Sequence, residues 1–393
     1  MSRTRAVPHQ NTVFRQLTNR LPWGVLGRAI EASRADKGIR RLPTRELLLA
    51  LLFAQTADAE SLRDIEAALE AHAARRYHSG LAAARRSTLA DALASRPVEV
   101  FAAVLSALIA QLTGRLRRNL GECVRLIDST PVKLNSLSAD WARFSANVCG
   151  AKAHVIYDPD ADCPLYLEVT PANVNDITAA KAMPIETGAT YVFDLGYYDF
   201  AFWAELDAAD CRIVTRLKSN TPLAVIETLP VAEDAPSVLS DRIGFLPERM
   251  ARSRRNPMHN AVREIRVKTE TGKILRILTN DLDAPASEIA ALYKRRWAIE
   301  LFFRWIKQTL QVKHFYGTSE NAVRIQITVA LIAFVLIKLA HVAQHAVTSL
   351  TRYARLVGHA VLHRKRLDRF GPRAGPPDHA AAHNPAQGAL LWI

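Results

Sequence analysis

Residues 292–308 read LYKRRWAIELFFRWIKQ, and the fold is organised around this segment. It contains no proline or glycine, and its apolar residues recur at helical spacing, which predicts one continuous helix with Ser287 as its N-cap. At about 100° per residue, one narrow polar stripe collects five side chains: Tyr293, Arg296, Glu300, Arg304 and Lys307. Apolar side chains cover much of the remaining circumference, so we expect the helix to pack inside a fold.

The carboxylate on this stripe has two interpretations. Glu300 lies four residues from both Arg296 and Arg304, and such pairs stabilise many ordinary helices. A carboxylate on a packed helix is also costly to bury without a partner or a purpose, which favours a functional site. Acidic residues at the ends of distant apolar strands strengthen the second interpretation.

The middle of the chain alternates between strand and helix patterns. Strands are predicted at 124–128, 153–157, 165–169, 191–194 and 211–216, and helices at 176–182 and 200–209. This order predicts an α/β fold with a mixed sheet and flanking helices. Further strand-like pieces at 223–228, 243–245, 262–267 and 274–279 predict a β-rich insertion at about 218–285. Its basic cluster, Arg252, Arg254 and Arg255, is interpreted either as a solvated loop or as a DNA contact.

The two ends of the chain differ from this middle part. Residues 1–120 are expected to form an all-helical domain, with Ser61 and Thr88 as predicted N-caps and a helix beginning at Pro97. This domain either binds DNA or serves dimerisation. Residues 121–362 form the predicted α/β domain and end in an apolar helix at about 322–346. Residues 363–393 are basic and rich in proline and glycine, which predicts a disordered tail.

Composition limits the partners and the compartment. A net charge of +14 and a pI of about 9.9 favour a polyanionic partner, with nucleic acid as the default. The four cysteines are far apart, which predicts free thiols. The longest apolar run, 327–337, is too short to span a bilayer, and the N-terminus shows no secretory signal. We therefore expect a cytoplasmic protein without a membrane partner.

Two aspartates supply the chemistry that Glu300 needs. Asp128 and Asp194 each follow an apolar strand, and ligands bind beyond the carboxyl ends of strands in open sheets. Three carboxylates are suitable ligands for Mg²⁺. Two Mg²⁺ ions can stabilise the attacking and the leaving oxygen of an in-line phosphoryl displacement. The stripe cations would hold DNA phosphates.

Several other residues are weaker candidates. Trp297 is interpreted as a core aromatic or as a base-stacking residue, and Lys152 and His154 either face the site or have ordinary placements. Competing carboxylates are Asp140, Asp158, Asp160, Asp162, Asp176 and Asp199.

Three segments together resemble a known family. IDST at 127–130, FDLGY at 193–197 and the spacing Tyr293-x2-Arg296-x3-Glu300-x6-Lys307 are similar to the signature of DDE transposases of bacterial insertion sequences. More narrowly, they resemble the insertion-sequence-four branch with its Y-R-E-K motif. The similarity extends over roughly residues 45–345.

The resemblance implies a ribonuclease-H-like catalytic fold with a β-strand insertion. It implies that Asp128, Asp194 and Glu300 bind two Mg²⁺ ions, with Mn²⁺ as a substitute. It also implies that Tyr293, Arg296 and Lys307 contact the double-stranded DNA of the transposon end. Arg304 is a further DNA-contact candidate from its place on the polar stripe.

The implied activity is cleavage of element ends and their transfer into target DNA, by a dimer on paired ends in the bacterial nucleoid. Some relatives hold a flipped base with an aromatic residue, for which Trp203 and Phe245 are weak candidates here. Leu195 stands where many relatives carry a basic residue. The alternatives are a catalytically silent DNA-binding protein or repressor derived from the element, and a nuclease of the same fold that does not join strands.

Overall fold

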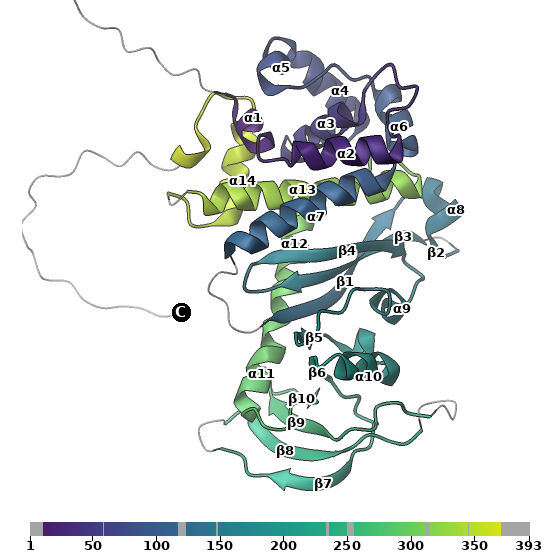
Figure 1. Cartoon of the computed structure of the whole chain (residues 1–393), viewed down its shortest axis with the longest axis vertical. Coiled ribbons are helices and arrows are strands. Elements are labelled where there is room, and N and C mark those ends of the chain that lie inside the picture. Colours follow the sequence, from purple (N-terminus) through teal and green to yellow (C-terminus); the bar gives the residue numbers. More distant parts are fainter. Residues whose placement is uncertain are drawn as a thin grey trace, which may run out of the picture.

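A computed structural model gives the fold of the chain. It describes residues 11–57, 59–116, 123–146, 148–232, 236–249, 255–310, 314–344 and 346–370. Arg252, Arg254 and residues 371–393 of the predicted tail lie outside these ranges. The first part of that tail, 363–370, is ordered and not disordered as predicted, because Leu367 and Phe370 are buried in the protein. Helices gather at one end of the molecule, and the last strands of a large sheet form the other end (Figure 1).

A ten-stranded mixed sheet runs through the molecule in the order β2-β3-β1-β5-β6-β10-β9-β8-β7, with β4 beside β3. The strands are β1 (Val124–Leu134), β2 (Arg143–Ser145), β3 (Val148–Asp158), β4 (Cys163–Pro171), β5 (Thr190–Val192), β6 (Arg212–Arg216), β7 (Ala224–Leu229), β8 (Val238–Phe245), β9 (Val262–Lys268) and β10 (Ile274–Thr279). Strands β1, β5 and β6 are parallel, and the other pairs are antiparallel. The predicted mixed sheet is confirmed. The strands predicted as an insertion, β7 to β10, continue the same sheet through the β10–β6 pair.

Parallel pairing at the centre of the sheet brings the two predicted aspartates together. Leu126 of β1 lies opposite Val192 of β5. Asp128 and Asp194 each follow two residues later, so both emerge at the same end of neighbouring strands. Asp128 does not end its strand as predicted, because β1 continues to Leu134 along β3.

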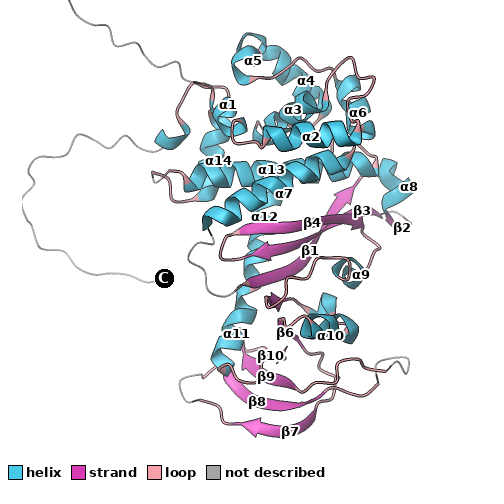
Figure 2. Ribbon diagram, in the orientation of Figure 1, coloured by secondary structure: helices cyan, strands magenta, loops and turns pink. Residues whose placement is uncertain are grey.

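The two faces of the sheet are covered by different helices (Figure 2). Successive side chains of a strand point to opposite faces. Leu126 accordingly belongs to an apolar core shared with α7 (Val98–Leu116), α12 (Trp297–Thr309) and α13 (Glu320–Val342), whereas Ile127 packs in a second core with α10 (Phe200–Ala208).

The first core also includes most of the remaining helices. These are α1 (Val13–Thr18), α2 (Trp23–Ser33), α3 (Thr44–Thr56), α4 (Leu62–Ala71), α6 (Arg86–Ser95), α11 (Ala286–Arg295) and α14 (Leu350–His359). Three short helices, α5 (Ala73–Ser79), α8 (Ala139–Ala142) and α9 (Asp176–Ala180), complete the set.

Helix α13 lies at the centre of the first core. Within the described residues it alone is straight, long and apolar enough to cross a membrane, but 83% of its apolar window is buried inside the protein. It packs against α7 and α3 from the N-terminal region, so its hydrophobicity is explained by burial within the protein.

The segment 292–308 was predicted to be one continuous helix, but the structure divides it into two. Helix α11 ends at Arg295, α12 begins at Trp297, and Arg296 lies at the junction. The amide of Arg296 bonds to the carbonyl of Tyr293, and the amide of Ile299 bonds to the carbonyl of Arg296. These three-residue spacings mark a tightened turn that hydrophobic periodicity does not reveal.

The predicted N-caps had mixed outcomes. Ser61 caps α4 by accepting from the amide of Asp64, as predicted. The predictions of Ser287 and Thr88 as N-caps were wrong. Helix α11 begins after Pro285 and α6 begins after Arg85, so both hydroxyl residues lie inside their helices. The predicted free thiols are confirmed for all four cysteines.

Candidate active site

Asp128 lies on β1 with its side chain 18% exposed. One carboxylate oxygen, Oδ1, accepts from the amide of Ser129 at 2.8 Å. The other, Oδ2, accepts from Nη1 of Arg296 at 3.2 Å. The side chain is therefore fixed from two directions.

Glu300 is held by the same arginine. It lies in the first turn of α12, and Nη2 of Arg296 donates to its Oε1 at 2.5 Å. A single guanidinium thus joins the carboxylate of β1 to the carboxylate of α12. The junction between α11 and α12 places Arg296 where its planar fork reaches both acids.

Asp194 follows β5 and caps the short turn Leu195–Tyr197 by accepting from the amide of Gly196 at 2.8 Å. Its charge acts on Asp128. Burial raises the pKa of Asp128 to about 6, the Ser129 amide and Arg296 oppose this shift, and the charges of Asp194 and Glu300 reinforce it. Three acids that are distant in the sequence therefore converge on one region.

The donor groups of this region fit divalent cations by type. Ionised carboxylates are the preferred ligands of Mg²⁺. Burial is the main cause of the raised pKa of Asp128, and a bound cation would oppose both that effect and the added repulsion from Asp194 and Glu300. Within the described residues, no three carboxylate, histidine or cysteine side chains are arranged to hold an ion as they stand. In this arrangement Arg296 contacts two of the three acids, Asp128 and Glu300.

The remaining stripe residues extend along α11 and α12. Tyr293 is partly buried, and burial raises its pKa, while the charges of Arg296 and Arg216 lower it. Nζ of Lys307 donates to the carbonyl of Pro131 at 2.8 Å, and Arg304 is exposed. The stripe therefore follows β1 away from the acids.

The structure changes the interpretation of the aromatic candidates. Trp297 is 51% exposed, so the core interpretation was wrong, and its ring is available at the surface beside the stripe. Trp203 is fully buried and donates to the carbonyl of Tyr197, which excludes it as a holder of a flipped base. Phe245 on β8 is 41% exposed.

Asp176 is a neighbour of the site that sequence reasoning placed only among competing acids. Its Oδ1 accepts from Oγ of Ser129 at 2.9 Å and from Nζ of Lys152 at 3.0 Å. His154 is buried beside it, with Nδ1 at 3.7 Å from the same oxygen. Lys152 and His154 therefore face the region of the acids, but from the side of Ser129.

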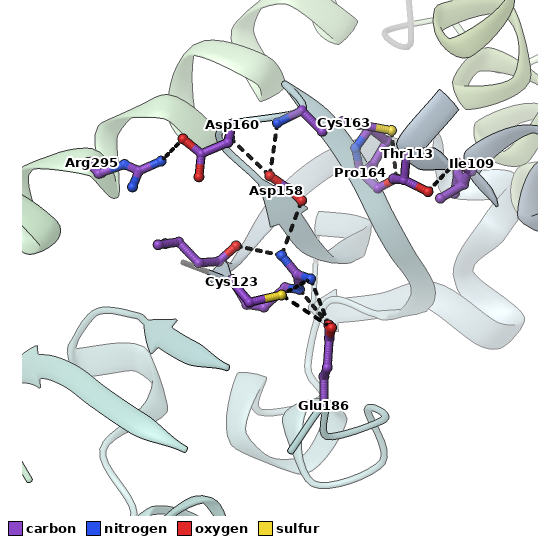
Figure 3. Close-up of polar contacts among 12 residues, drawn as sticks. Ile109, Thr113, Cys123, Asp158, Asp160, Cys163, Pro164, Glu186 and Arg295 are labelled. Carbon is purple, nitrogen blue, oxygen red and sulfur yellow. Dashed lines mark hydrogen bonds and ion pairs between the residues drawn. The ribbon is translucent and has the colours of Figure 1, made fainter. Parts of the chain in front are cut away.

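The other competing acids near the sheet have structural partners. Figure 3 shows Asp158 and Asp160 in a polar network with Cys123, Glu186 and Arg295. Buried Arg125 lies at its centre, 3.1 Å from Asp158 and 2.7 Å from Glu186. Asp160 pairs with Arg295 at the end of α11. This network anchors the helix that carries Tyr293 to the turn between β3 and β4.

Comparison with known proteins identifies the family of the chain. The family model of the transposase DDE domain matches residues 119–336, and a model described only as a domain of unknown function matches residues 9–82. A putative transposase, y4zB of Sinorhizobium fredii, is 41% identical over 78% of this chain and 86% of its own length.

Two further similarities are more distant. A probable transposase for insertion sequence element IS5377 of Geobacillus stearothermophilus is 29% identical over 66% of this chain and 68% of its own length. The piggyBac transposase in its synaptic complex with hairpin DNA has a TM-score of 0.47 at 10% identity, covering 90% of this chain and 80% of that one. Because the DDE-domain model matches more than half of the sequence, the chain belongs to the DDE transposase family and is a DNA transposase.

Proposed function

We propose that this transposase cuts the ends of an insertion sequence and joins them to target DNA at a site formed by Asp128, Asp194 and Glu300. The observation that carries the proposal is the convergence of these acids from β1, the end of β5 and α12 around one arginine. Relatives named as transposases of insertion sequences support the choice of substrate.

Enzymes with this domain use divalent metal ions, and we propose Mg²⁺ as the ion, with Mn²⁺ as its substitute. When bound, two such ions would supply the charge that stabilises the attacking and leaving oxygens of an in-line phosphoryl transfer. The chain itself contributes the geometry. Ser129 orients Asp128, and Gly196 orients Asp194, through amide hydrogen bonds of 2.8 Å each.

The cationic stripe provides a binding surface for the DNA strand. Arg304 is exposed, Lys307 donates to the carbonyl of Pro131 on β1, and Tyr293 lies close enough to Arg296 for that charge to lower the tyrosine pKa. A guanidinium binds phosphate with the same planar fork that it uses for carboxylate. We therefore propose that Arg296 exchanges its carboxylate partners for a DNA phosphate when metal and DNA bind, and that two chains act together on paired ends in the bacterial cytoplasm.

The test uses purified protein, labelled double-stranded DNA carrying the terminal inverted repeats that flank the coding region, and Mg²⁺. Cleavage and strand transfer are expected for the wild type and are expected to be lost in Asp194→Ala. Lys294→Ala serves as a control, because this exposed lysine of α11 pairs with Glu270 in the turn between β9 and β10 and contacts none of the three acids through that pair. Activity that survives Asp194→Ala would refute the assignment, and DNA binding without cleavage by the wild type would indicate a silent repressor.

A further inference from the structure

Asp176 has no role in the proposed chemistry, yet it lies next to Ser129 and Gly196, the residues whose amides hold two of the three acids. It is the first residue of α9, and its side chain is 24% exposed. Oδ1 accepts two hydrogen bonds, one from Oγ of Ser129 and one from Nζ of Lys152. An acid with two well-placed donors is fixed in one orientation.

The contact with Ser129 connects Asp176 to Asp128. Ser129 donates its hydroxyl to Asp176 at 2.9 Å and its amide to Asp128 at 2.8 Å. The two side chains of adjacent strand residues point to opposite faces of the sheet. Asp176 therefore supports Asp128 from the opposite face, through the backbone of Ser129.

Gly196 provides a second connection, between Asp176 and Asp194. A Cβ atom added at Gly196 would lie 3.4 Å from Oδ2 of Asp176 and 3.0 Å from Oδ1 of Asp194. The two carboxylates thus approach the same glycine, whose amide holds Asp194. The loop after β5 therefore passes close to Asp176 at Gly196.

The charge of Asp176 is neutralised locally. Lys152 is the cation at 3.0 Å, with its side chain 20% exposed. Burial lowers the pKa of His154 to about 4, so this ring is neutral at neutral pH, and its Nε2 bonds to Oγ1 of Thr170. A carboxylate paired in this way adds structure beside the acids without adding net negative charge.

We propose that Asp176 is a positioning residue of the transposase active site, which fixes Asp128 through Ser129 and confines the Asp194 loop at Gly196, with Lys152 as its counter-ion. The inference rests on the proposed function, because it assumes that Asp128 and Asp194 bind the metal. Outer residues that orient metal ligands typically change metal affinity by about 10- to 100-fold when they are removed.

The test measures Mn²⁺ binding to the full-length, DNA-free protein by isothermal titration calorimetry, together with thermal unfolding. Asp176→Ala is expected to weaken Mn²⁺ binding by about 10-fold. Ser129→Ala is expected to weaken it as well, and Ser129→Thr to retain it, because threonine keeps the hydroxyl. The double variant Asp176→Ala/Ser129→Ala is expected to bind Mn²⁺ as tightly as Asp176→Ala alone, because the Ser129 hydroxyl acts through its hydrogen bond to Asp176.

Asp199→Ala is the matched control. Like Asp176, Asp199 lies at the start of a helix, pairs with a lysine at 3.1 Å and has a partly exposed side chain (23%). Unlike Asp176, it caps its helix, α10, and its lysine is Lys181. It is expected to lose stability, by about 1 kcal/mol for a lost cap, with unchanged Mn²⁺ affinity.

Two results for Asp176→Ala would overturn the proposal. If Asp176→Ala binds Mn²⁺ with wild-type affinity, Asp176 has only a structural role. If it loses Mn²⁺ binding completely, as expected for Asp194→Ala, Asp176 is a direct metal ligand. Mn²⁺ binding that survives Asp194→Ala would overturn the proposed metal site and this inference together, which distinguishes the two failures.

Discussion

Replacing Asp128 with asparagine is expected to stabilise the metal-free protein while removing a proposed metal ligand. Burial, reinforced by the charges of Asp194 and Glu300, raises the pKa of Asp128 from 3.8 to about 6. Ionising this carboxyl group therefore costs free energy in the folded state. At about 1.4 kcal/mol per pKa unit, the cost is about 3 kcal/mol when the group is fully ionised.

The pH dependence follows from the direction of the shift. Between the two pKa values the folded state binds more protons than the unfolded state, so the stability falls as the pH rises. The penalty is present in full above about pH 7, falls to about 1 kcal/mol at about pH 4.5, and vanishes at lower pH. Asparagine carries no such penalty, and it retains an oxygen for the amide of Ser129.

The assay is thermal unfolding in EDTA at about pH 7.5 and about pH 4.5. Asp128→Asn is expected to unfold about 4 °C above the wild type at the higher pH, with most of the gap lost at the lower pH. Asp140→Asn, which changes an exposed acid of α8, controls for the loss of one negative charge and is expected to change little. Equal stability at both pH values, or a gap that does not shrink on acidification, would refute the reasoning.

Three further changes test other parts of the structure. Arg296→Gln is expected to bind Mn²⁺ more tightly than the wild type in calorimetry, because it releases two carboxylates, whereas an Arg296 that merely positions them would give weaker binding. Glu264→Gln is expected to destabilise the protein by about 3–5 kcal/mol in urea unfolding, because Glu264 is fully buried among three arginines; a loss below about 1 kcal/mol would contradict this. Arg304→Ala is expected to weaken DNA binding and to lower the slope of log K against log salt by about 1, while an unchanged slope would exclude a phosphate contact.

The sequence predicted the convergence of the acids because it depends on local signals. An apolar strand ending in an acid, found twice, indicates adjacent strands in a mixed sheet, and the register of β1 and β5 places Asp128 and Asp194 side by side. Glu300 was found from the polar stripe of its helix. These signals are encoded within a few residues of each acid.

The missed features depend on contacts between distant segments. The break at Arg296 is associated with contacts to Asp128 and Glu300, and helical periodicity carries no information about it. Trp297 was expected in the core because aromatic residues usually are, but its face of α12 is uncovered. Asp176 resembled several other acids after turns, and only the positions of Ser129 and Lys152 in the sheet distinguish it.

The burial of α13 bears on how this protein can be dissected in the laboratory. Its most hydrophobic segment is covered in part by α7 and α3, which are encoded more than 200 residues earlier. A truncated chain that begins at β1 would expose that surface to water and is expected to aggregate or to associate with detergent. Biochemical work on the acids alone therefore needs the first third of the polypeptide, whatever further role those helices have.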